Sequence, residues 1–345
     1  MEPMLALLID CCRRTLSDAE LALLAGRLAK ADGARLAFLA RRHRVEGLVW
    51  RTISRTGIVP FGTQPIAEAA RRIAADGLLM AMESRRVHQA FSRASLPHLF
   101  VKGLTLGTLA WGDPLVKQQL DIDLLVPPTA TGKAAQLLDA LGYVQQIPDP
   151  SVDPADWHRS RKESQWRSDD GILLDLHSRL GDHPALIPTV TATVPPRMVE
   201  VPGGFALPTL PERLLLPYLA VHGASSAWFR LKWLADFAAV VARTEPAVLA
   251  TLTEQAPRLG AGRSLASSLI LANRLLGTPL PEGLEADGVT LRLVRLATKA
   301  LSDPDEPTQK RFGTVPMHLA QLLMVPGSHY FLSELVRKLG MLLTR

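Results

Sequence analysis

Residues 121–126 constrain the fold of this chain more than any other stretch. They read DIDLLV, which is apolar apart from two acids. Side chains of a strand alternate between its two faces, so Asp121 and Asp123 share one face while Ile122 and Leu124 share the other. The two acids then lie roughly 6–7 Å apart along the strand. The pattern predicts a half-buried strand that presents two carboxylates together.

Two neighbouring carboxylates repel each other, and one of them tends to take up a proton. A divalent cation with oxygen ligands removes this cost, because its charge offsets both acids. Sites that hold two metal ions about 3.5–4 Å apart support in-line displacement at phosphorus. We therefore expect Asp121 and Asp123 to be catalytic metal ligands. Alternatively, these two acids have no catalytic role and simply lie at the edge of a hairpin.

A phosphate-binding turn is expected shortly before these acids. Residues 99–101 have the pattern of a strand, which leads into Lys102 and Gly103 and then into an apolar helical pattern. A strand, a glycine and a helix N-terminus often bind phosphate, through free backbone N–H groups and the helix dipole. Lys102 would add a positive charge there. We expect Lys102 and Gly103 to contact a phosphate group.

A second acidic strand is predicted at residues 172–178, which read ILLDLHS. The preceding SDDG, residues 168–171, indicates a hairpin with residues 163–167. Asp175 and His177 share the strand face opposite the leucines. The spacing fits an antiparallel strand beside residues 121–126.

Several motifs together resemble the signature of the uncharacterised nucleotidyltransferase family, which belongs to the DNA polymerase β-like nucleotidyltransferase superfamily. They are the Lys-Gly pair at 102–103, the Asp-Pro pair at 113–114, Lys117 and residues 121–126. The family usually has Arg where this chain has Lys117, and the superfamily usually has Gly-Ser at the helix start. The resemblance implies that Lys117 contacts phosphate. An ordinary surface lysine is the alternative.

The resemblance continues downstream and implies further site residues. Superfamily members supply a third carboxylate from a neighbouring strand, and Asp175 with His177 matches the acid–apolar–His motif of the family. His177 would orient a carboxylate or serve as a core histidine. His158 matches a family histidine that precedes the hairpin. Arg230, in a Trp-rich motif at residues 228–236, would reach nucleotide phosphates, unless it belongs to a packed aromatic helix with solvated charges.

The fold class expected is α+β, with a small mixed β-sheet nucleotidyltransferase core flanked by N-terminal and C-terminal helical regions. We expect an N-terminal helical region over residues 1–95, the α/β core over 96–205 and a C-terminal helical domain over 206–345. Residues 181–210 give no firm secondary-structure expectation. Amphipathic segments at 319–325 and 331–343 favour helices docked on the domain, with a membrane-surface helix as the alternative.

The net charge of +6 comes from residues 1–95, where Lys and Arg outnumber Asp and Glu by 15 to 9. Arginine pairs occur there, the first at Arg13-Arg14. The excess indicates either an anionic partner or the solvated faces of helices. The two cysteines, Cys11 and Cys12, are adjacent, which fits a reduced compartment. With no apolar run long enough to span a bilayer, a cytoplasmic location is expected.

The expected function is metal-dependent nucleotidyl transfer, which moves an NMP from an NTP such as ATP to a hydroxyl or amine acceptor. The acceptor could be a small molecule, a peptide or protein, or RNA. Asp121, Asp123 and Asp175 would hold two Mg²⁺ ions, with Mn²⁺ as the alternative. A kinase-like phosphoryl transfer on the same fold is one competing hypothesis. A non-catalytic nucleotide-binding or toxin–antitoxin partner is the other. Base preference and oligomeric state stay open.

Overall fold

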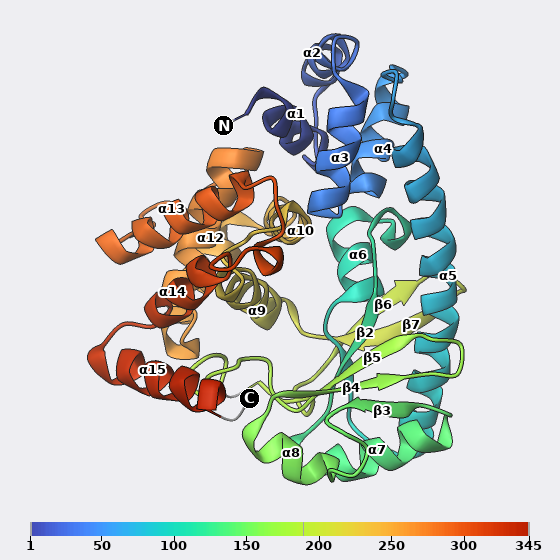
Figure 1. Ribbon diagram of the computed structural model, residues 1–345, viewed down its shortest axis with the longest axis vertical. Coiled ribbons are helices and arrows are strands. Elements are labelled where there is room, and N and C mark those ends of the chain that lie inside the picture. The colour runs from blue at the N-terminus through green and yellow to red at the C-terminus, as the bar shows by residue number, and fades with distance from the viewer. Residues whose placement is uncertain (1, 189, 344–345) are drawn as a thin grey trace. The chain divides into compact units, whose positions relative to one another are not determined.

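The computed structural model describes residues 2–188 and 190–343, which divide into two compact units (Figure 1). The helical unit comprises Met1–Ala70, His183–Ile187 and Leu216–Arg345, and the α/β unit comprises Arg71–Asp182 and Pro188–Leu215. The chain is thus α+β, as predicted. The three-part domain division expected from the sequence stays a prediction, and the structure groups most of its first and last parts in one unit.

The helical unit is built from short helices joined by loops. Its elements are α1 (Pro3–Cys11), α2 (Asp18–Leu28), α3 (Gly33–His43), α4 (Glu46–Thr56), α10 (Leu231–Val241), α11 (Pro246–Gln255), α12 (Gly262–Leu276), α13 (Gly288–Ser302), α14 (Val315–Leu323) and α15 (Ser328–Leu343). Short 3₁₀ turns lie at Ala256–Leu259 and Pro307–Gln309. Two helices, α5 (Gln64–Arg93) and α9 (Glu212–Ser225), run from one unit into the other.

The α/β unit alternates strands and helices. After α5 it contains β1 (Leu99–Phe100), α6 (Gly103–Trp111), β2 (Asp121–Leu125), α7 (Thr131–Ala140), β3 (Val144–Ile147), α8 (Pro154–Ser160), β4 (Glu163–Arg167), β5 (Leu173–His177), β6 (Arg197–Val201) and β7 (Phe205–Thr209). Turns of 3₁₀ helix lie at Pro114–Val116 and Pro128–Ala130. The predicted strands at 99–101, 121–126 and 172–178 are therefore present, with ends that differ by one residue or so.

The described residues form a five-stranded mixed sheet in the order β1-β2-β5-β4-β3. The expectation that β5 lies antiparallel to β2 is wrong, because the two strands are parallel. The reason is the connection between them. Helix α7 carries the chain back, so that β3 runs in the same direction as β2. The antiparallel pairs β3–β4 and β4–β5 then reverse the chain twice, and β5 regains the direction of β2.

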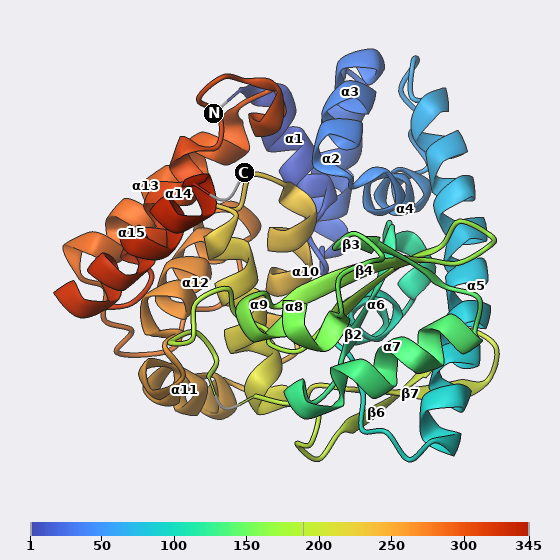
Figure 2. The same ribbon diagram turned by 60° about the horizontal axis from the view of Figure 1, so that its bottom comes forward.

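One hydrophobic core explains why β2 and β5 are held in the middle of this sheet. Ile122 and Leu124 of β2, with Leu174 and Leu176 of β5, pack against apolar side chains of α5 and α7. Figures 1 and 2 both show α5 and α7 beside the sheet. The alternation predicted for both strands is thereby confirmed, and their acidic side chains face away from this core.

Local signals explain where several helices of the helical unit begin. Ser17 caps α2, because its hydroxyl accepts a hydrogen bond from the backbone N–H of Glu20, whose carboxylate accepts from the Ser17 N–H. Asp32 caps α3 in the same manner through the N–H of Arg35.

The hairpin of β6 and β7 was not predicted. Its strands are antiparallel, and Gly203 and Gly204 in the intervening turn both have positive φ angles. Across the described residues, no helix combines the length and the apolar character needed to cross a bilayer.

Burial predicts a large difference between Leu124, which lies within β2, and Leu120, which precedes the strand. Leu124 is fully buried and Leu120 is 43 % exposed. Replacing Leu124 with Ala should lower the free energy of unfolding by about 2–5 kcal/mol, because the change removes buried methyl groups and leaves a cavity. Leu120→Ala should cost less than about 0.5 kcal/mol. Urea denaturation of both variants checks this, and equal losses would contradict the burial of Leu124 in the core.

Candidate active site

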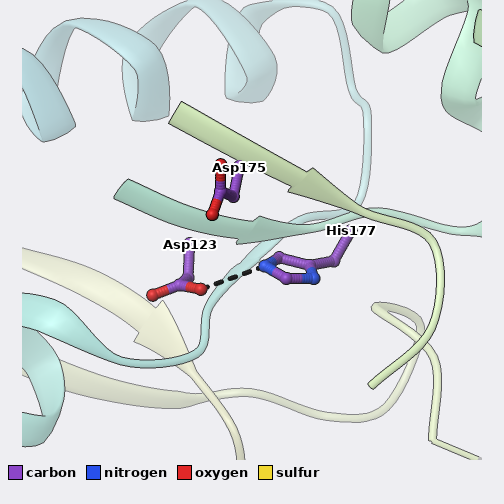
Figure 3. Close-up of side chains that lie close together, drawn as sticks. All are labelled: Asp123, Asp175 and His177. Carbon is purple, nitrogen blue, oxygen red and sulfur yellow. Dashed lines mark hydrogen bonds and ion pairs between the residues drawn. The ribbon is translucent and has the colours of Figure 1, made fainter. Parts of the chain in front are cut away.

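Two neighbouring strands bring the acidic side chains together. In the parallel register of β2 and β5, Asp123 lies opposite Asp175. Because each side chain of a matched pair points to the same face, the two carboxylates meet beside the sheet. His177 follows on the same face of β5 (Figure 3). One ligand atom from each of Asp123, Asp175 and His177 lies within 4.8 Å of the others.

Asp123 is the most constrained member of this cluster. It is 6 % exposed, and its Oδ1 lies 2.7 Å from Nζ of Lys102 and 3.0 Å from Nε2 of His177. Burial acts to raise the pKa of this carboxyl group, but the Lys102 ammonium and the hydrogen-bonded His177 outweigh burial and hold the pKa well below its usual range. Asp123 is therefore ionised.

Asp175 has the opposite electrostatic environment. Burial, followed by the negative charges of Asp123 and Asp121, raises its pKa to about 6. The Nε2 group of Gln165 donates a hydrogen bond of 3.2 Å to Asp175 Oδ1. The two facing carboxyl groups thus differ in proton affinity, and Asp175 can exchange a proton near neutral pH.

His177 links the cluster to the hairpin partner of β5. While Nε2 faces Asp123, Nδ1 lies 3.3 Å from a carboxylate oxygen of Glu163 on β4. The imidazole is 4 % exposed. With both ring nitrogens held by acidic partners, His177 can fix the orientation of Asp123, which is one of the two roles expected for it.

The predicted phosphate turn lies at the start of α6. Gly103 is the first residue of this helix and has a φ angle of +62°, a conformation that favours glycine. A Cβ atom at this position would also lie 3.1 Å from Oε1 of Gln119. Thr105 stabilises the turn, because its hydroxyl donates to the carbonyl of Phe100 or Lys102, both at 3.0 Å. The N-terminal N–H groups of α6 are thereby positioned as in a phosphate-binding turn.

A small cavity joins the turn to the acids of β2. Its lining includes Lys102, Gly103, Gln119, Asp121 and Asp123. The Nε2 donor of Gln119 is buried and has no hydrogen-bond partner in the described part of the chain. Asp121 is half-buried and lies outside the three-residue cluster, although its charge acts on Asp175.

Three other residues singled out in the sequence are not part of the three-residue cluster. Lys117 is 8 % exposed, so it is not an ordinary surface lysine. Arg230 belongs to the helical unit, where it pairs with Glu306 at 3.1 Å, and its role as a phosphate contact stays a prediction. His158 is buried between the hydroxyl groups of Ser164 and Ser178, at 3.0 and 2.9 Å, and supports the ends of the hairpin.

The sequence prediction missed Gln119, Glu163 and Gln165. A signal for the last two was present. The predicted turn at 168–171 sets the register of the hairpin, in which Gln165 lies opposite Asp175 and Glu163 opposite His177. No sequence pattern marked Gln119, whose position depends on how the loop before β2 packs against Gly103.

The residues of the site fit a divalent cation. Two carboxylates and an imidazole converge within ligand distance of one another, and the raised pKa of Asp175 reflects burial and, after it, negative charge that a cation would offset. Asp121, Asp123 and Asp175 offer the oxygen donors that Mg²⁺ and Mn²⁺ prefer, while the nitrogen of His177 suits Mn²⁺ better than Mg²⁺.

The shifted pKa of Asp175 predicts a pH-dependent cost to stability. Because folding raises this pKa from 3.8 to about 6, the folded state loses stability as pH rises from about 4 to about 6, and the cost persists above that range. In EDTA at pH 7.5, Asp175→Asn should therefore be more stable than wild type by on the order of 1 kcal/mol. The gain should vanish near pH 4.

Asp170→Asn, an exposed change in the turn before β5, is the matched control and should show no such gain. Urea denaturation at both pH values measures the difference. If Asp175→Asn were less stable than wild type at pH 7.5, the ionised Asp175 carboxylate would not destabilise the folded state, and the prediction would be wrong.

The family of this chain follows from its similarity to known protein families. No functionally characterised protein in the curated comparison matches the sequence. The family described as "Uncharacterised nucleotidyltransferase" matches residues 29–277. This span includes the predicted phosphate turn at Lys102 and Gly103, both acidic strands and the start of the C-terminal helices. Since this match covers well over half of the sequence, the chain belongs to the uncharacterised nucleotidyltransferase family.

Proposed function

We propose that the protein is a metal-dependent nucleotidyltransferase that moves an NMP from an NTP to a hydroxyl or amine acceptor. One observation carries the proposal. Asp123 and Asp175 converge from parallel strands, and Asp123 and Asp121 border a glycine turn with the geometry of a phosphate site. Membership in the family supports nucleotidyl transfer in general, and the site adds the groups that such a reaction requires.

Each residue has a distinct role in the proposed reaction. The backbone at Gly103 and the ammonium group of Lys102 bind the phosphates of the NTP. Two Mg²⁺ ions, or Mn²⁺, would be held by Asp121, Asp123 and Asp175. When bound, the metal supplies positive charge against the phosphate oxygens and the attacking oxygen. Lys117 would add a further phosphate contact.

Asp175, the carboxylate that faces Asp123 from β5, is the group proposed to accept the proton of the acceptor. The acceptor oxygen or nitrogen forms a bond to the α-phosphorus, and the bond between the α-phosphorus and its bridging oxygen breaks. Pyrophosphate leaves with the bonding electrons. His177 keeps Asp123 oriented throughout.

The finer assignments extend the proposal. ATP is the first NTP to test. The nucleotidyltransferase core would correspond to residues 96–205. The protein would be located in the cytoplasm. A small molecule, a peptide or protein, and RNA are the three acceptor classes.

The decisive substitution is Asp123→Asn, which keeps the shape of the side chain and removes its charge. Nucleotidyl transfer should fall by about 100-fold or more, because the metal ion that would neutralise the phosphates loses a carboxylate ligand. The assay is mass spectrometry of purified protein and cell extract after incubation with Mg²⁺ and each NTP. Asp170→Asn, exposed in the β4–β5 turn, is the control and should retain activity.

The mass of the product separates the competing functions. An added NMP that Asp123→Asn abolishes supports the proposal and identifies both the base and the acceptor. An added phosphate alone would assign the protein to kinase-like transfer. Nucleotide binding without any adduct across the extracts would favour the non-catalytic partner.

A further inference from the structure

The arginine pair at residues 13–14 has no role in the proposed reaction, and it borders a separate cavity in the helical unit. This cavity has a volume of about 170 Å³ and lies where the chain leaves α1, beside α10 and the end of α12. Its polar lining includes Arg13, Arg14, Thr15 and Thr278. Cys12, two alanines of α10 and Ala242, just after α10, form part of the apolar wall.

Two hydrogen-bond donors at the cavity lack partners. The Nε atom of Arg13 is buried and makes no hydrogen bond in the described part of the chain, and the same holds for Oγ1 of Thr278. Thr278 is 5 % exposed, so water has little access to its hydroxyl group. A buried donor without a partner costs free energy, which an acceptor atom in the cavity would recover.

These donors are held in place by their neighbours. A terminal nitrogen of Arg13 pairs with Glu20 at 2.7 Å, and Glu20 is itself fixed by the cap of α2. Nδ2 of Asn273 donates a 2.7 Å hydrogen bond to the carbonyl of Thr278. The arrangement is therefore already formed before any ligand enters, which lowers the cost of binding.

Charges of both signs lie around the cavity: Asp10 and Asp236 act on Cys12, while Arg13 and Arg14 are in the lining. Glu20 offsets one guanidinium group, and the C-terminal ends of α1 and α12 contribute partial negative charges. Against these stand Arg13, Arg14 and, close behind Arg14, Arg243. Burial, and after it the charge of Arg243, lowers the pKa of Arg14, so two like charges are crowded together here. An anion between them would relieve this repulsion.

The thiol at the cavity does not compete for such a role. Cys12 is 1 % exposed, and burial raises the pKa of its thiol well above the usual range. It is therefore a neutral wall residue, which leaves the arginines and Thr278 to recognise a ligand.

We propose that this cavity is a binding site for a phosphate group, distinct from the candidate active site, with Arg13, Arg14 and Thr278 as its ligands. Its volume admits a phosphate or pyrophosphate group, and guanidinium and hydroxyl donors match phosphate oxygens. The site would be occupied by free inorganic phosphate, by pyrophosphate or by the phosphate end of a larger ligand.

Isothermal titration calorimetry of the full chain tests this proposal with inorganic phosphate and pyrophosphate as separate probes, in EDTA so that no metal occupies the acidic site. Wild type should bind at least one of them at millimolar concentration or below. Arg14→Gln should weaken binding about tenfold, through loss of a charged contact. Thr278→Val should weaken it about threefold, because a neutral hydrogen bond is lost.

Arg55→Gln is the matched control, since Arg55 is an exposed arginine on α4 of the same unit. Its affinity should equal that of wild type. Hydrogen exchange provides a second readout, in which the probe should slow exchange at residues 12–15 and 277–279. If Arg14→Gln fails to fold, hydrogen exchange and the Thr278→Val variant still test whether the anion binds in this cavity.

The absence of binding and of protection with both probes would overturn the proposal, and the arginines would then only neutralise helix ends. Equal affinities in wild type, Arg14→Gln and Thr278→Val would place the bound anion elsewhere and would overturn it as well. A preference between the two probes identifies whether a single phosphate or a diphosphate is the better ligand.

Discussion

Repulsion between carboxylates on one face of two parallel strands is the constraint on which the site depends. Asp123 and Asp175 lie opposite each other with Asp121 near by, and burial together with the charges of Asp123 and Asp121 raises the pKa of Asp175. The pKa of Asp123 is lowered instead, because Lys102 and His177 both contact this carboxylate. The fold thus maintains one ionised and one proton-accepting carboxyl group side by side, an arrangement that active sites often use and that stability alone would not favour.

Topology produces this arrangement from ordinary elements. The crossover through α7 and two hairpin reversals bring β5 parallel to β2, in a register that matches Asp123 with Asp175. The same strands bury their leucines against α5 and α7, and this packing fixes the register. A shift of one residue would turn the acids into the core. The packing therefore provides the rigidity that a site of convergent charges requires.

Much of the site could be predicted because its signals are local. Alternation in residues 121–126 and 172–178 correctly assigned the faces, and the turn at 168–171 correctly indicated the hairpin. The parallel direction of β5 could not be derived from spacing alone, since it depends on the path of the chain through α7, β3 and β4. The candidate metal cluster also includes His177, which the sequence did not identify as a ligand, and the role of Asp121 as a ligand stays a prediction. The hairpin of β6 and β7 was missed, although the pair Gly203-Gly204 was a usable turn signal.

The central claim is that the acidic cluster is a cation site, and binding of Mn²⁺ tests it most directly. Electron paramagnetic resonance reports free Mn²⁺, whose signal falls as the protein binds the ion. Wild type should bind Mn²⁺, and binding should tighten when an NTP analogue that resists cleavage is added. Asp123→Asn and Asp175→Asn should each lose most of this binding, while Asp170→Asn retains it. Equal binding by all four proteins would contradict the account, because it would mean that the carboxylates that converge from β2 and β5 do not hold the ion.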